Sequence, residues 1–124
     1  MRLFLGLGAI FGGLAVAGGA FASHALQGRL SERSLEIFET GTRYQMYHAL
    51  ALILVALLLF NNESKGQSLL IASGTAMTVG VVLFSGSLYA LSFTGITMLG
   101  AITPLGGIAF LMGWGCLAIA ALKL

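Results

Sequence analysis

The sequence predicts an all-α membrane protein: a four-transmembrane-helix up-down bundle with a short amphipathic interfacial helix between helices 1 and 2. Composition supports this fold class, because the 124-residue chain is 58% hydrophobic and only 8% charged, whereas soluble domains carry roughly 25% charged residues. The few charges also cluster, and they leave apolar runs of membrane-spanning length between them. We therefore expect a single integral membrane domain over residues 1–124.

The first apolar run covers residues 3–22 and follows Arg2. About twenty residues at a rise of 1.5 Å per residue cross the hydrocarbon core, which is about 30 Å thick. An alternative is a signal peptide, because Ala20-Phe21-Ala22 resembles a cleavage site. The many glycines of the run instead favour a retained helix that packs closely on a neighbour. By the same criterion of length and hydropathy, the four predicted spans are residues 3–22, 44–60, 68–91 and 104–122.

A separate amphipathic helix is predicted over residues 31–42. Ser31 is a suitable N-cap, and Glu32 stands in the first turn, where the helix dipole favours an acid. Placed at 100° intervals, the charged and the apolar side chains of this segment fall on opposite sides. Such a helix is too short and too charged to span, so we expect it to lie in the plane of the interface. Gly41 is expected to mark the bend where the chain turns into the bilayer.

The short connections between spans predict an up-down order. The termini and residues 61–67 then share one side of the membrane, and residues 23–43 and 92–103 share the other. Thr103 and Pro104 are expected as the N-cap and first residue of the last span. Basic residues divide equally between the two sides, so the positive-inside rule alone gives no orientation. Because acids match the arginines of the second side, we expect both termini in the cytoplasm and the protein in the cell inner membrane.

Alternating spans bring the polar ends of several helices into one leaflet. Ionisable residues inside a membrane are costly, and they usually mark a functional interior or form pairs. Two simpler interpretations use the same residues: Arg43 reaches the headgroups and pairs with Glu39, and His48 only bonds Tyr89 or a backbone carbonyl. The sequence nevertheless predicts a one-sided polar pocket, a candidate ligand-binding site lined by His24, Glu39, Arg43, Tyr44, Tyr47, His48, Ser85 and Tyr89.

The polar residues do not match a recognised catalytic pattern. Two histidines without a second carboxylate or thiolate nearby are a weak signal for haem or metal. A serine hydrolase needs an acid to orient its histidine, no glycine-rich segment has the context of a nucleotide site, and no basic cluster suits nucleic acid. We therefore predict no enzyme activity, no metal, no cofactor and no nucleic-acid partner, and Cys116 is expected to be a core thiol.

Several motifs resemble those of one known family. The string Arg43-Tyr-Gln-Met-Tyr-His48 is the most specific, and the others are Gly19-Ala-Phe-Ala-Ser-His24, Phe84-Ser-Gly-Ser-Leu-Tyr89, Ile102-Thr-Pro-Leu-Gly-Gly107 and Gly113-Trp114. Together they are similar to the small bacterial inner-membrane family typified by YgdD and YwdK, a domain of unknown function. The resemblance runs over essentially the whole chain and implies a four-span membrane protein. It implies no reaction, substrate or cofactor.

Three functions fit these observations. The first is action by association, as a small subunit or stabiliser of a larger membrane complex or as a homo-oligomer, favoured by the glycine-rich first and last spans. The second is a small transporter or channel. The third is a lipid- or quinone-binding module that uses Arg43, the tyrosines and His48. In every case the lipid bilayer is the surrounding partner, and a bound lipid is expected in the third.

Overall fold

The computed structural model describes residues 1–61 and 65–124 and contains only helices and their connections over these residues. Four helical stretches are each long and apolar enough to cross a membrane, which confirms an all-helical fold with four candidate spans. The middle of the third stretch is a short π-helix, and a 3₁₀-helix precedes the fourth long helix. In chain order the elements are α1 (Arg2–His24), α2 (Glu32–Asn61), α3 (Gln67–Gly80), η1 (Val81–Ser85), α4 (Gly86–Thr94), η2 (Thr97–Ala101) and α5 (Thr103–Ala121).

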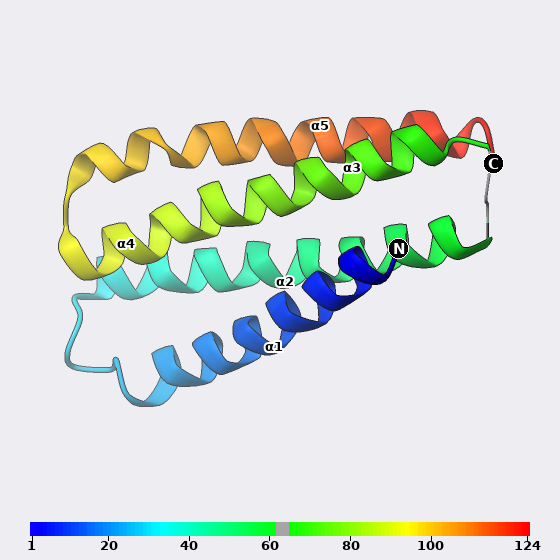
Figure 1. Cartoon of the computed structure of the whole chain (residues 1–124). Helices are drawn as coiled ribbons and strands as arrows, with labels where there is room; N and C mark the ends of the chain where they lie inside the picture. Colours follow the sequence, from blue (N-terminus) through cyan, green and yellow to red (C-terminus); the bar gives the residue numbers. More distant parts are fainter. Residues whose placement is uncertain (62–64) are drawn as a thin grey trace.

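The helix α2 occupies the centre of the packing. It contacts α1 on one side and α3, η1 and α4 on the other, while α5 packs on α3 and η1. Figure 1 places the start of α1, the Asn61 end of α2 and the C terminus toward one end of the molecule. Part of the predicted 61–67 connection lies outside the described residues. The up-down passage of these helices through a bilayer stays a prediction.

The separate interfacial helix predicted over residues 31–42 is not present, because α2 runs without a break from Glu32 to Asn61. Its start agrees with the prediction: the backbone N–H of Ser34 donates to Ser31 Oγ at 3.1 Å, as an N-cap requires. The expected bend at Gly41 was wrong. A helical glycine costs only about 1 kcal/mol relative to alanine, and the missing side chain makes room for Tyr89, whose Cε1 would lie 2.7 Å from an added Cβ.

The continuous α2 is longer than a membrane requires. Its 30 residues extend about 45 Å at 1.5 Å per residue, against about 30 Å of hydrocarbon. The charged turns predicted as a separate helix are therefore the first turns of this long helix.

Close contacts between helices occur where glycine removes a side chain. A Cβ on Gly8 of α1 would lie 2.8 Å from the carbonyl oxygen of Ala49, and one on Gly74 of α3 would lie 2.6 Å from the ring of Phe4. One on Gly106 of α5 would overlap the backbone of Phe84 in η1. Glycine at these positions lets helix backbones or aromatic rings approach more closely than larger residues allow.

The core is small, and much of the outer surface is apolar. Leu52, Val55, Leu70 and Met77 are fully buried between α2 and α3, whereas large apolar side chains remain exposed on every long helix. An apolar exterior of this extent suits contact with lipid rather than water.

Candidate functional site

A chain of hydrogen bonds joins three helices at Gln45. The hydroxyl of Tyr89 on α4 donates to Gln45 Oε1 at 2.6 Å, and Gln45 Nε2 donates to the carbonyl oxygen of Phe11 on α1 at 2.8 Å. Gln45 is only 5% exposed, so its amide must find partners inside the protein. We call Phe11, Gln45 and Tyr89 the Gln45 junction. It links α1, α2 and α4 through a single side chain.

A groove lies against this junction, between α1 and the α2–α4 pair. Its volume is about 550 Å³, and its polar lining side chains are Gln45 and Tyr89, whereas the other lining residues are apolar. We call it the α1 groove; it is lined by Leu14, Ala17, Gly18, Phe21, Phe38, Gln45 and Tyr89.

A second junction forms three residues further along α2, at His48. Nε1 of Trp114 on α5 donates to His48 Nε2 at 3.0 Å, and His48 Nδ1 lies 2.7 Å from the carbonyl oxygen of Tyr44. The imidazole also stacks on Phe110, with ring centroids 3.5 Å apart and planes 8° apart. We call Tyr44, His48, Phe110 and Trp114 the His48 junction. It ties α2 to α5.

The hydrogen bonds of His48 determine its tautomer. An indole N–H can only donate, so Nε2 of His48 must accept, and Nδ1 therefore carries the proton and donates to the Tyr44 carbonyl. Of the two partners expected for His48, the backbone carbonyl is present, whereas Tyr89 bonds Gln45 instead. Both ring nitrogens are occupied, so His48 in this arrangement has no free lone pair for a metal. The described residues contain no group of three or more His, Cys, Asp or Glu side chains arranged around a metal position.

A second groove opens beside the His48 junction, on the side of α5. It holds about 440 Å³, and its walls are almost wholly aromatic and aliphatic. We call it the α5 groove; it is lined by Tyr44, His48, Phe84, Pro104, Gly107, Ile108, Phe110, Leu111 and Trp114.

Ser85 acts between helices and not toward either groove. Its hydroxyl donates to the carbonyl oxygen of Gly41 at 2.7 Å, which connects the π-helix η1 to α2. Two residues later, the hydroxyls of Ser87 and Thr103 lie 2.6 Å apart and connect α4 to α5. Thr103 is the first residue of α5 and makes no capping bond, so its predicted N-cap role is wrong: the hydroxyl is used by Ser87 instead.

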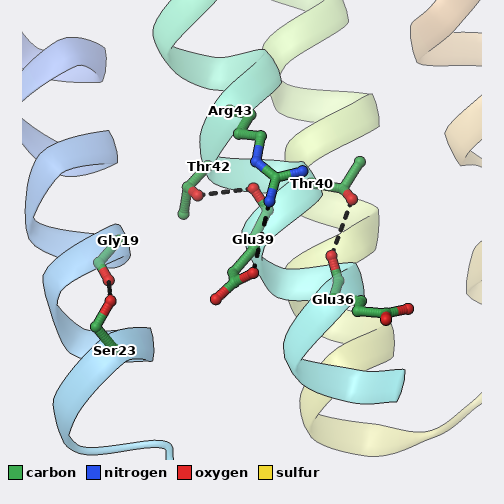
Figure 2. A network of polar contacts seen from close by, with 7 residues as sticks. All are labelled: Gly19, Ser23, Glu36, Glu39, Thr40, Thr42 and Arg43. Atoms are coloured by element: carbon green, nitrogen blue, oxygen red, sulfur yellow. Dashed lines mark hydrogen bonds and ion pairs between the residues drawn. The ribbon is translucent and has the colours of Figure 1, made fainter. Parts of the chain in front are cut away.

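The charged residues of the predicted pocket lie on the outer side of α2. Arg43 Nη2 is 3.6 Å from Glu39 Oε2, and the two side chains are 61% and 36% exposed. Figure 2 shows this pair, and beside it the hydroxyl of Thr42 turned back onto the carbonyl of Glu39 in its own helix. The expected pairing of Arg43 with Glu39 is therefore present. At this exposure it contributes at most about 1 kcal/mol.

The remaining predicted residues lie apart from both junctions or at their edge. His24 is exposed in the last turn of α1. Tyr47 is 53% exposed and meets Tyr44 edge to face, with ring centroids 5.6 Å apart. The structure thus separates the eight predicted residues: Tyr89 belongs to the Gln45 junction, Tyr44 and His48 to the His48 junction, and the others to a helix contact or the surface. A ligand at any of them stays a prediction.

Sequence analysis left Gln45 out of the pocket, although a local signal identifies it. At 100° per residue, Gln45 falls about 40° from Gly41 and from Ala49, and about 160° from Arg43. Gly41 and Ala49 are small and Arg43 is charged, so the pattern assigns Gln45 to the inner face. Trp114 carries no such signal, since its partner is 66 residues away in the sequence.

Comparisons with known proteins agree with the membrane fold. The family described as "Protein of unknown function (DUF423)" matches residues 18–107. The UPF0382 membrane protein YwdK of Bacillus subtilis is 48% identical over 123 residues, which cover 99% of this chain and 98% of that protein. UPF0382 membrane proteins of Staphylococcus epidermidis and Staphylococcus saprophyticus are 44% and 40% identical, and cover 99% and 100% of this chain and 98% and 100% of their own lengths. No solved structure matches the chain significantly.

Proposed function

This chain belongs to the DUF423 family of proteins of unknown function, and we propose that it acts in the membrane by association, as a homo-oligomer formed through α1. In this proposal its four helices cross the cell inner membrane in alternating directions. Both termini face the cytoplasm, and the charged first turns of α2 lie at the opposite headgroups.

The observation that supports association is a pair of opposite faces on α1. One face places Gly8, Ala15 and Ala22 in a buried row against α2. The other face repeats the same seven-residue spacing two positions earlier, and all three of its residues are exposed: Gly6, Gly13 and Ala20.

This outer face matches a helix-packing surface in its chemistry. At 100° per residue its three members fall within about 40° of one another, and a Cβ on Gly6 or Gly13 would meet no atom within 4 Å. Small residues let membrane helices approach closely, whereas they offer lipid chains little to contact. The buried row against α2 shows that this chain uses the seven-residue spacing for helix packing. We propose that a second copy of α1 packs on the exposed row.

The test is the native mass of the protein after gentle extraction from its own membranes. We expect a mass that is a whole multiple of the chain, and a shift toward the monomer in Gly13→Leu. Gly86→Leu is the matched control, because Gly86 on α4 also has no atom within 4 Å of an added Cβ. A wild-type monomer, or a Gly13→Leu variant that assembles as the wild type does, would contradict the homo-oligomer. A recurring second protein lost in Gly13→Leu would make the chain an accessory subunit instead.

A further inference from the structure

The Gln45 amide retains hydrogen-bonding capacity that the fold does not use. A glutamine amide carries two N–H donors and an oxygen with two lone pairs. Among the described residues, Nε2 donates once, to Phe11, and Oε1 accepts once, from Tyr89. One N–H and one lone pair are left on a side chain that is 5% exposed. In low-dielectric surroundings a spare donor of this kind favours an incoming acceptor.

Gln45 also lines the α1 groove. Gln45 and Tyr89 are its polar lining side chains, and no charged residue lines it. Its volume of about 550 Å³ falls within the roughly 300–1,000 Å³ typical of small-molecule sites, which are mostly apolar with a few placed polar groups. Leu14, Ala17 and Phe21 line the groove and are also exposed on α1, so the groove is open toward the surrounding lipid.

We propose that the α1 groove binds an uncharged lipid whose carbonyl oxygen accepts a hydrogen bond from Gln45 Nε2. The carbonyl supplies the acceptor that the spare N–H lacks. The lipid's hydrocarbon chain lies along Leu14, Phe21 and Phe38. There it makes the apolar contacts that bilayer lipid would otherwise make. An anionic headgroup is disfavoured at this amide, because the groove has no cation to compensate for the loss of its solvation.

Two kinds of neutral lipid offer such a carbonyl oxygen: an acylglycerol has it in its ester, and a prenyl quinone has it on its ring. Native mass spectrometry of the full-length protein distinguishes them when dioleoylglycerol and menaquinone are titrated separately, with phosphatidylglycerol as the charged comparison. We expect one of the two neutral lipids to bind with one-to-one stoichiometry per chain and phosphatidylglycerol to bind more weakly. Ala17 lies about 40° from Gly13 on α1. Subunit number and bound lipid appear as separate masses, so lipid binding is read separately for each oligomeric state.

Two pairs of variants locate the lipid. Gln45→Leu and Tyr89→Phe both lose the bond between these residues, but only Gln45→Leu removes the spare N–H. We expect Gln45→Leu to weaken binding about tenfold, in line with one hydrogen bond, and Tyr89→Phe to weaken it less. Ala17→Phe fills the groove from its exposed rim and should abolish binding. Ala118→Phe, an equal change at an exposed position on α5 outside the groove, should leave binding unchanged.

Several results would overturn the inference. Binding of neither neutral lipid to the wild type would do so, as would a preference for phosphatidylglycerol that Ala17→Phe removes. Equal loss in Gln45→Leu and Tyr89→Phe would assign Gln45 a structural role only. If Gln45→Leu fails to fold, Ala17→Phe alone tests the site, because an exposed position accepts a larger side chain without unfolding the protein. Binding that persists in a folded Ala17→Phe variant would show that the lipid binds elsewhere.

Discussion

The two polar junctions of α2 lie three residues apart and differ in how completely they are satisfied. At the His48 junction, both ring nitrogens are bonded and Phe110 stacks on the imidazole face. At the Gln45 junction, the amide bonds two helices and still has one N–H and one lone pair to spare. Polarity alone therefore does not identify a binding site in this protein. Unused hydrogen-bonding capacity beside a groove is the better criterion.

The junctions also differ in what holds their helices together. On the α5 side, Gly106 lies directly against the backbone of Phe84, and Gly80 lies against the ring of Phe110. On the α1 side, Gly18 approaches a Thr42 methyl group, and a Cβ on Gly8 would lie 2.8 Å from the Ala49 carbonyl oxygen, farther than a Cβ on Gly106 would lie from the Phe84 backbone. The backbone contact is tighter on the α5 side, so the His48 junction should tolerate less disturbance.

The largest effect is expected from Gly106→Ala. Its new Cβ would overlap the Phe84 backbone, which forces α5 away from η1 and costs about 2 kcal/mol of unfolding free energy, as overpacking typically does. The single tryptophan, Trp114, should change its fluorescence as its bond to His48 lengthens. Denaturant titration of the purified protein measures both effects.

The neighbouring glycine provides the control. An added Cβ on Gly107 meets no atom within 4 Å, so Gly107→Ala should keep the unfolding free energy or raise it by up to about 1 kcal/mol, through helix propensity. Equal destabilisation by Gly106→Ala and Gly107→Ala would show that the contact between Gly106 and the Phe84 backbone is not a tight one.

The next effect is expected from His48→Leu. The substitution leaves the Trp114 N–H without its acceptor and removes the stacked ring from Phe110, for a loss of about 1.5 kcal/mol. Trp114→Phe removes the donor from the other side. When two residues share a bond, the free-energy losses of their single variants do not add, so the double variant should lose less unfolding free energy than the sum of the two single variants. A loss in the double variant equal to that sum would argue against the hydrogen bond between them.

A smaller effect is expected from Tyr89→Phe. It removes one interhelical hydrogen bond, and such bonds in membrane proteins average about 0.6 kcal/mol. Tyr47→Phe is a matched control, because Tyr47 is 53% exposed and meets Tyr44 through its ring; its unfolding free energy should stay that of the wild type. A loss at Tyr89 as large as that of His48→Leu would remove the distinction between the two junctions.

The sequence was informative where local chemistry decides the structure. Long apolar runs predicted the four helices, Ser31 predicted the start of α2, and the spacing of Glu39 and Arg43 predicted their pair. It failed where a distant contact decides. Gly41 suggested a bend because glycine is a weak helix former, but the Tyr89 ring that occupies its space comes from another helix. The bond from Trp114 to His48 likewise depends on how α5 packs, which no local pattern of α2 indicates.

Arg43, the most conspicuous charge of the predicted pocket, belongs to neither junction and has a minor role. Arg43 is 61% exposed, pairs with a Glu39 that is itself partly exposed, and lines neither groove. Arg43→Ala should therefore change the unfolding free energy by no more than about 0.5 kcal/mol, and it should leave neutral-lipid binding in the α1 groove within about twofold of the wild type. Denaturant titration and lipid titration by native mass spectrometry give the two values. If Arg43→Ala abolishes lipid binding in a stable protein, the ligand's polar group lies at the outer side of α2, and the one-sided pocket that includes Arg43 describes the site better than the groove beside Gln45.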